Sequence, residues 1–425
     1  MTQQQEVSPA IASMELKRCR EYRHTGWMKR WDRGCMSKNI VLLLDGTSNQ
    51  ISEDRTNVLR IYQTLKKDES QLVYYDPGVG TFGGDGAWFR IVSKAREVLG
   101  LATGMGLDRN VKEAYRFLVE NYKSGKATGE DGERDRIVIF GFSRGAYTAR
   151  VLAGFIHAVG LMEPHNLNLL DYAYRAYKGV DEKDDHDADS FREVRLFERT
   201  LDTDRPPIRL LGLFDTVASV IERGRSGIRL KSHAFTSRNL SVQSVLHALA
   251  IDERRTMFQP QLWEPDQEYW GNPFNRAAAV PQDVKEVWFV GGHGDIGGGY
   301  PEKQSALAKV PLAWMIREAK KRGVLFRTQN VNAIAHGTRE DDDHVPPDTL
   351  AAAHETLTFG WKLIELIPRK KPKLSKRPSL LGLSIPFGEQ RTIPEGALVH
   401  QSVIERRNAL GIWTKNMPMA FEVEE

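Results

Sequence analysis

Apolar residues in this chain gather in short uninterrupted runs, and segments with helical periodicity separate these runs. The pattern is clearest in NIVLLLD (39–45), QLVYYD (71–76), DRIVIFG (135–141), IRLLGLFDT (208–216) and VKEVWFVGGHGD (284–295). A continuous apolar run favours a strand that is covered on both faces, as in a parallel sheet. We therefore expect these five segments to be strands of one sheet.

Helical periodicity fills the intervals between the runs. Residues 54–67, 108–123 and 146–161 are predicted to be helices, and in the second of them the apolar positions recur on one face. Strands that alternate with helices indicate βαβ units, and hence an α/β fold with a mainly parallel sheet and helices on both faces. In such folds the reactive groups lie in loops at the carboxyl ends of the strands.

Two long intervals, at about 163–205 and 328–395, interrupt this alternation. The first contains the acidic DEKDDHDADS, and the second contains REDDDHVPPD and the basic RKKPKLSKRP. We expect both to be insertions that form a cap or lid on a single domain spanning 39–425. Residues 1–38 are polar and basic, and we expect them to form a loosely held N-terminal arm.

Composition narrows the function classes without changing this picture. The 425 residues include 60 basic and 56 acidic side chains, for a net charge of +4, so nucleic acid is not expected as a partner. The chain has only two cysteines, Cys19 and Cys35, which excludes a disulfide framework and a four-cysteine metal site. Reduced thiols are favoured, and a single Cys19–Cys35 bridge is the alternative. No apolar run of about 18 residues and no N-terminal signal core is visible. The sequence predicts a cytoplasmic protein, or one exported by a route independent of a signal peptide.

The stretch GFSRG, which follows the DRIVIF run, fits the nucleophile-elbow pattern G-x-S-x-G with Gly141, Ser143 and Gly145. A serine on a sharp strand-to-helix turn has an exposed hydroxyl, and glycines two residues before and after it avoid collisions. The apolar strand before the pattern and the alanine-rich helix after it provide the required context. We predict that Ser143 is a nucleophile; the alternative is a structural turn serine.

A nucleophilic serine needs a base and an acid that orients the base. Asp215 and His293 follow Ser143 in the usual chain order, and each lies at the end of a predicted strand. The glycines around His293 predict an imidazole that is exposed in a tight loop. Two alternatives stay open: Asp295 as the orienting acid, and His400 as the base with Asp295 as its partner.

Backbone N–H groups are expected to hold the oxyanion. The residue after the nucleophile, Arg144, supplies one of them. The early loop DGTSNQ offers the second, from Gly46 or Thr47. The alternative for this loop is a simple turn in which Asp45 and Thr47 act only as caps.

Three other motifs are given simpler interpretations. GVGTFG (78–83) matches a dinucleotide pattern, but no acidic strand end lies about twenty residues beyond it, so a loop over the active site is favoured. The clusters DDHDAD and DDDH lack metal-ligand spacing and are interpreted as solvated surface. RKKPKLSKRPSLLGLSIPF joins basic residues to an apolar stretch, and it is either an exposed loop or a docking segment for anionic lipid.

The motifs IVLLLDGTSNQ, YYDPGVGT, GFSRGAYTAR, LLGLFDTVAS and EVWFVGGHGDIGGGY occur in an order that resembles one family of uncharacterised α/β-hydrolases. This family includes the class-one lipase effectors of type VI secretion. The resemblance extends from about residue 39 to 300, and it implies the α/β-hydrolase fold and a phospholipase A that acts on phospholipid acyl esters. It also implies Ser143 as the nucleophile, with Asp215 and His293 as its partners.

Residues and resemblance together predict a serine ester hydrolase that needs neither a metal nor an organic cofactor. Its substrate would be a lipid or another ester, with peripheral membrane contact and an immunity or secretion partner as further candidates. One alternative is a carboxylesterase or deacylase of a soluble ester. The other is a catalytically inactive interaction module with a hydrolase-like fold.

Overall fold

The computed structural model describes residues 37–46, 55–78, 105–124, 134–180, 191–217, 221–224, 227–230, 233–271, 276–338, 344–370, 378 and 383–425. Nearly all of the predicted N-terminal arm, with Cys19 and Cys35, lies outside these ranges. So do Thr47, most of GVGTFG and the acidic runs of both predicted insertions.

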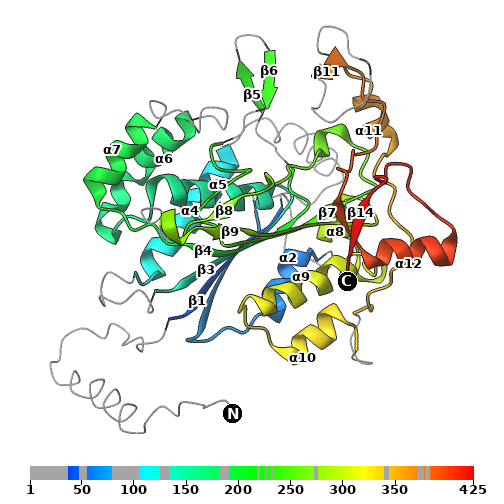
Figure 1. Cartoon of the computed structure of the whole chain (residues 1–425), viewed down its shortest axis with the longest axis horizontal. Helices are drawn as coiled ribbons and strands as arrows, with labels where there is room; N and C mark the ends of the chain where they lie inside the picture. Colours follow the sequence, from blue (N-terminus) through cyan, green and yellow to red (C-terminus); the bar gives the residue numbers. More distant parts are fainter. Residues whose placement is uncertain are drawn as a thin grey trace, which may run out of the picture. The chain divides into compact units, whose positions relative to one another are not determined.

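An eight-stranded sheet organises the described residues, with the order β14-β13-β10-β7-β4-β3-β1-β2 (Figure 1). Every neighbouring pair in it is parallel. The strands are β1 (Asn39–Leu44), β2 (Gln71–Asp76), β3 (Arg136–Phe142), β4 (Ile208–Phe214), β7 (Ser244–Ala250), β10 (Asp283–Phe289), β13 (Ala397–His400) and β14 (Phe421–Glu424). The predicted α/β fold with a mainly parallel sheet is confirmed.

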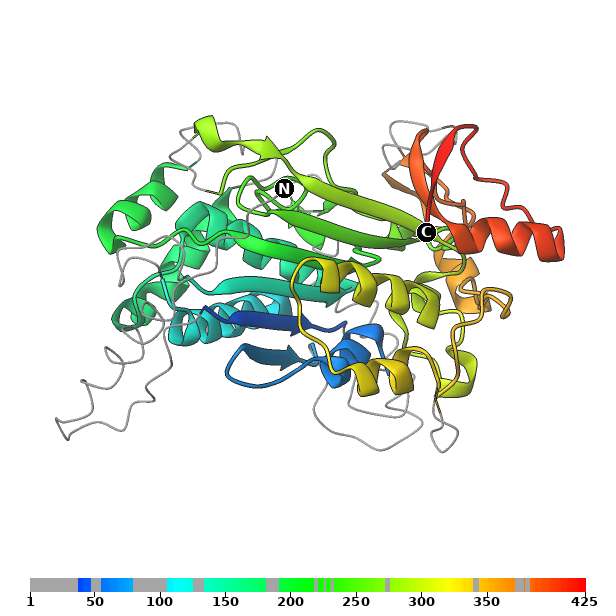
Figure 2. The ribbon, with the colours of Figure 1, turned by 60° about the horizontal axis from the view of Figure 1, so that its bottom comes forward.

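Helices cover both faces of the sheet, as the alternation predicts. One face carries α4 (Met105–Asn121), α5 (Arg144–Val159) and α6 (Leu170–Gly179), and the other carries α2 (Asn57–Thr64) and α9 (Lys309–Lys321) (Figure 2). Successive residues of β1 divide between the two cores: Ile40 and Leu42 pack on the first face, and Val41 and Leu43 pack on the second. A strand buried on both sides cannot alternate apolar with polar residues, which is why the sequence shows an unbroken run.

Two further groups of elements lie beyond the predicted strands. The first interval contains α6 and α7 (Arg192–Leu201), and α6 packs against α5 in the same core. The second contains α10 (Thr328–Asn330), α11 (Phe359–Ile364) and a short antiparallel pair of β11 (Arg369–Lys370) and β12 (Leu383–Ser384). α12 (Gln401–Leu410) follows β13 and packs against it.

Candidate active site

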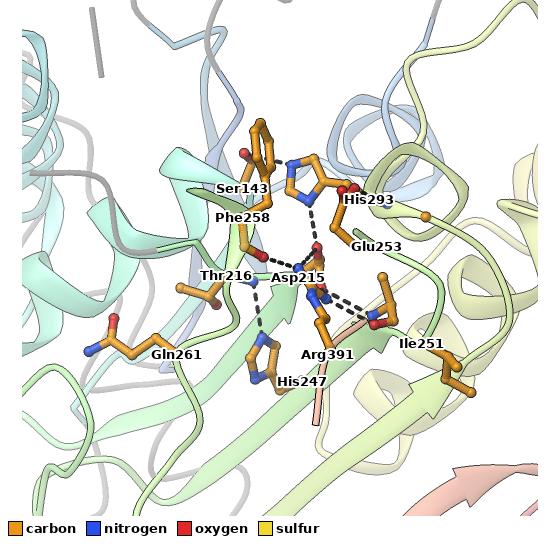
Figure 3. Close-up of polar contacts among 12 residues, drawn as sticks. Ser143, Asp215, Thr216, His247, Ile251, Glu253, Phe258, Gln261, His293 and Arg391 are labelled. Carbon is orange, nitrogen blue, oxygen red and sulfur yellow. Dashed lines mark hydrogen bonds and ion pairs between the residues drawn. The ribbon is translucent and has the colours of Figure 1, made fainter. Parts of the chain in front are cut away.

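Three side chains from three strand ends meet at one edge of the sheet (Figure 3). Ser143 follows β3, Asp215 follows β4, and His293 begins the short helix α8 (His293–Gly297) after β10. His293 Nε2 lies 2.8 Å from Ser143 Oγ, and His293 Nδ1 lies 2.5 Å from Asp215 Oδ2. The structure therefore joins the three first-choice residues in one hydrogen-bonded chain, because parallel strands end at the same edge.

Ser143 has a backbone conformation that few non-glycine residues adopt. Its φ is 57° and its ψ is −120°, and such a conformation costs about 1–3 kcal/mol. A Cβ on Gly145 would collide with the carbonyl oxygen of Leu44, and a Cβ on Gly141 would lie 2.6 Å from the Ala146 Cα. The turn between β3 and α5 thus requires glycine at both flanking positions, which is the steric reason for the G-x-S-x-G pattern.

The His293 ring is enclosed rather than exposed, which differs from the expectation drawn from its glycine neighbours. The residue is 7% exposed, and its ring packs against those of Phe142 and Phe258, with centroid distances of 4.7 and 5.0 Å. Its backbone N–H donates to Glu253 Oε2 at 3.2 Å. The small glycines allow the chain to turn tightly into α8, while the two aromatic rings shield the imidazole.

Asp215 is fully buried and accepts several hydrogen bonds besides the one from His293. The N–H of Ala250, at the end of β7, donates to its Oδ1 at 3.0 Å. The Arg391 guanidinium contacts both carboxylate oxygens, at 2.6 and 2.9 Å. Burial alone would raise the pKa of Asp215, but the charge of Arg391 and the hydrogen bond from His293 hold that pKa well below its usual range.

The two alternative residues have other partners. Asp295 accepts hydrogen bonds from the Gly292 N–H at 2.9 Å and from His354, whose Nδ1 lies 2.6 Å from its Oδ1. His400 caps α12 by accepting from the Ser402 N–H, and its ring stacks on a neighbouring phenylalanine. Burial lowers the pKa of His400 to about 4. Neither residue is hydrogen-bonded to Ser143 in the part of the chain that the structure describes.

The predicted oxyanion donors lie after two neighbouring strands, β1 and β3. Arg144 directly follows Ser143 and is the first residue of α5. The Gly46 N–H donates to Asp45 Oδ1 at 2.7 Å, so an oxyanion would have to share it. Asp45 also accepts from the hydroxyl groups of Thr56 and Tyr75, at 2.5 and 2.9 Å. Thr47 lies outside the described residues.

Several residues around the site carried no signal in the sequence. Arg391, which binds Asp215, lies far along the chain from the strand-end motifs. Glu253, which accepts from the His293 backbone N–H, forms an ion pair with Arg255 at 2.8 Å. His247, in β7, accepts from the Thr216 N–H at 3.1 Å (Figure 3). Only the tertiary fold brings these groups to the site.

The described residues carry neither a metal-binding cluster nor a membrane-spanning helix. No group of three or more His, Cys, Asp or Glu side chains there is arranged to hold a metal ion. No helix in these ranges is long and apolar enough to cross a bilayer.

Known proteins similar to this chain provide an independent comparison. A sequence model of the catalytic domain of Tle1-like phospholipase effectors of type VI secretion matches residues 38–318. An uncharacterized protein of Saccharomyces cerevisiae, YEL023C, is 34% identical over 245 residues, which are 54% of this chain and 33% of that protein. The chain therefore spans only a third of the length of this curated relative.

Two solved structures show remote similarity. The crystal structure of an uncharacterized protein from Pseudomonas aeruginosa aligns with 76% of this chain and 50% of its own, at 20% identity and a TM-score of 0.37. The Tle1 effector bound to the VgrG spike of the type 6 secretion system aligns with 68% of this chain and 57% of its own, at 16% identity and a TM-score of 0.32. Scores this low add nothing to the assignment, which rests on the family match alone. That match spans more than half of the chain, so the protein belongs to the Tle1-like family of type VI secretion phospholipase effectors.

Proposed function

We propose that Ser143, His293 and Asp215 form a catalytic triad that cleaves carboxylic esters through an acyl-enzyme. The observation that carries this proposal is the Ser143 hydroxyl, held on a strained turn 2.8 Å from His293 Nε2. This distance is within the range for direct proton transfer. The depressed pKa of Asp215 keeps the acid ionised near neutral pH, so it can accept a hydrogen bond from the Nδ1–H and leave Nε2 as the base.

The proposed cycle has two halves. His293 Nε2 takes the hydroxyl proton as Ser143 Oγ attacks the ester carbonyl carbon, and the Arg144 N–H stabilises the oxyanion. The C–O bond to the leaving alcohol then breaks, and Nε2 passes its proton to that alcohol. In the second half the same imidazole deprotonates water, which attacks the acyl carbon. The carboxylic acid leaves, and the proton returns to Oγ.

We propose phospholipid acyl esters as the substrate class, in a phospholipase A-type reaction. Family membership supports this choice, and so does a group of exposed apolar side chains that we call the apolar ridge. Phe359 in this ridge is 77% exposed. The full set is Phe359, Leu363, Leu366, Ile367, Leu383, Ile385 and Phe387. Large exposed apolar patches are typical of surfaces that dock on a partner or a membrane.

The apolar ridge is connected to the proposed base through aromatic rings. Trp361 of α11 packs edge-on against Phe258 at 5.6 Å, and Phe258 packs edge-on against His293 at 5.0 Å. Glu365 fixes the ridge to the same loop, because it accepts from the Thr256 N–H at 3.0 Å. A lipid surface that contacts the ridge would therefore lie close to the proposed site.

Charge in the sequence supports an anionic lipid surface as the contact. Lys362 is exposed beside the apolar residues of α11, and residues 369–377 contain six lysines and arginines and no acidic residue. Each basic residue near an anionic surface contributes about 1 kcal/mol. We therefore propose that the protein makes peripheral membrane contact through the apolar ridge.

Turnover on anionic phospholipid vesicles, compared with a short-chain soluble ester, tests the substrate class. We expect the double variant Phe359→Ser/Leu363→Ser to lose at least about tenfold in vesicle turnover, because it removes two apolar side chains from the contact. Its turnover of the soluble ester should stay unchanged. Leu196→Ser on α7 is the matched control, since Leu196 is 64% exposed and lies outside the ridge.

Two outcomes would favour the alternatives. Activity confined to the soluble ester, in the wild-type protein and the ridge variant alike, would favour a carboxylesterase or deacylase. A folded protein that turns over neither substrate would favour an inactive interaction module. A secretion or immunity partner remains a prediction that follows from family membership.

A further inference from the structure

The partners of the Asp215 carboxylate include one that a triad acid does not require. Its Oδ1 accepts from the Ala250 N–H and from Arg391 Nη1, and its Oδ2 accepts from His293 Nδ1 and from Arg391 Nη2. A carboxylate offers about four lone-pair positions, so this carboxylate is saturated. Two of its four donors belong to a single guanidinium in a fork-like arrangement.

Arg391 is itself held from several sides. Its side chain is 1% exposed, and its Nη1 also donates to the Ala250 carbonyl at 2.9 Å. Its Nη2 donates to the carbonyl of Phe258, the residue whose ring packs against His293. The Asn416 side chain donates to the Arg391 carbonyl at 2.9 Å and fixes the backbone. One cation thus joins the ends of β4 and β7 to the loop that covers the proposed base.

We propose that Arg391 is a positioning residue of the active site, which holds Asp215 against His293 and offsets the charge of the carboxylate that the imidazole meets. The inference rests on the proposed triad. A lone buried carboxylate would stabilise a protonated imidazole strongly. A carboxylate already paired with a guanidinium attracts that proton less, because the two charges nearly cancel at the imidazole.

Two other charged groups close to His293 are already paired. Glu253, which accepts from the His293 backbone N–H, is bound to Arg255. Asp295, on the same short helix, is bound to His354. Replacing Arg391 leaves both pairs in place, so the change in local charge comes from Arg391 alone.

The position of Arg391 adds a second consequence. The family match ends at residue 318, and Arg391 lies well beyond it, between β12 and β13. The segment matched by the family model therefore contains Asp215 but not Arg391, the cation paired with it. The C-terminal part of the chain supplies the cation.

The test is the rate of labelling by a fluorophosphonate probe as a function of pH, which needs no knowledge of the natural substrate. We expect Arg391→Met to label at least about tenfold more slowly at neutral pH, and the midpoint of its acidic limb to rise by about one pH unit. Arg391→Lys should keep the wild-type midpoint and lose rate, because an ammonium retains the charge but cannot bind both oxygens as a fork.

Arg406→Met is the matched control. Arg406 is also largely buried in the C-terminal part, but it donates to the carbonyls of Thr349 and Ala351. It should lose stability and keep the midpoint. A folded Arg391→Met protein with the wild-type midpoint would overturn the proposal. If that variant does not fold, an Arg391→Lys protein with the wild-type labelling rate at every pH would overturn it.

Ser143→Ala separates this proposal from the triad on which it rests. If Ser143→Ala still labels at the wild-type rate, the proposed nucleophile is wrong. If Ser143→Ala does not label and Arg391→Met behaves as wild type, the triad stands and only the role of Arg391 is wrong.

Discussion

Two Asp–His pairs each contribute one residue to the first turn of the same short helix, α8, and among the described residues only one of the pairs is hydrogen-bonded to a serine. In the first pair His293 Nδ1 lies 2.5 Å from Asp215, and in the second His354 Nδ1 lies 2.6 Å from Asp295. By this distance the pairs are nearly equivalent. An Asp–His contact alone therefore does not make a candidate triad.

The surroundings of the two pairs differ in enclosure and in what the imidazole faces. Asp215 is fully buried, and the ring of its histidine reaches a hydroxyl on a strained turn. The side chain of His354 is 24% exposed, and its ring stacks on Tyr300 at 3.7 Å. Asp295 meanwhile caps the start of α8 through the Gly292 N–H. The first pair has the geometry that the proposed proton transfer needs, whereas the second ties the start of α8 to the segment that carries His354.

The largest expected effect comes from exchanging the two histidines for alanine. His293→Ala should lower kcat/KM on a soluble ester by about 10⁴-fold or more, because among the described side chains His293 is the base hydrogen-bonded to the hydroxyl. His354→Ala should change it by less than about fivefold, since that ring contacts no reacting group. Steady-state kinetics on both proteins measure the difference. Equal losses in the two variants would contradict the assignment of the base.

The two acids should differ in the same direction with a smaller separation. Asp215→Asn should lower kcat by about 10³–10⁴-fold, because an amide no longer fixes the Nδ1–H tautomer. Asp295→Asn should keep most of the activity and lose about 1–2 kcal/mol of stability, since it weakens a buried helix cap. Kinetics and thermal unfolding of the same two samples test both statements. An Asp295→Asn protein as inactive as Asp215→Asn would reopen Asp295 as the orienting acid.

The smallest expected effect concerns Glu253, which accepts a hydrogen bond from the His293 backbone N–H. It should appear in stability rather than in rate. Burial would raise the pKa of Glu253, but hydrogen bonds and charge from Arg255 lower it from 4.5 to about 2. Between about pH 2 and pH 4.5 the unfolded chain therefore binds more protons than the native one. The lowered pKa of Glu253 stabilises the native state above about pH 4.5, and this stabilisation is lost as the pH falls toward 2.

Glu253→Gln should remove that dependence. We expect the variant to be less stable than wild type at pH 7 by about 1–3 kcal/mol, and the gap in Tm to narrow between pH 5 and pH 3. Calorimetry over this range measures it. A gap that stays constant with pH would show that Glu253 is not held ionised in the native state.

Much of the site could be predicted because its chemistry is local in the sequence. The turn at Ser143 requires Gly141 and Gly145, so the five-residue pattern G-x-S-x-G indicates this turn in the sequence. Asp215 and His293 each follow an apolar run, and the parallel sheet brings strand ends together. Arg391 leaves no such trace, because an arginine in an irregular segment looks like any exposed arginine until the fold buries it.

The strands differ in the same way, because some could be predicted from the sequence and others could not. β1 and β3 are unbroken apolar runs and were predicted, whereas β7 was not. Its sequence, SVLHALA, is short and includes His247, so neither periodicity nor composition distinguishes it from a helix or a loop. Only the surrounding structure shows why a histidine is tolerated there: its ring bonds to the Thr216 N–H and to Glu286. β14 is an edge strand of four residues, too short for an alternation to be recognised.

The most direct measurement is mass spectrometry of the folded protein after reaction with a fluorophosphonate. The account predicts a single adduct on Ser143 that forms rapidly in the wild-type protein, slows by orders of magnitude in His293→Ala and is absent in Ser143→Ala. An unmodified Ser143 in the folded wild-type protein, or an adduct that forms equally fast without His293, would contradict it.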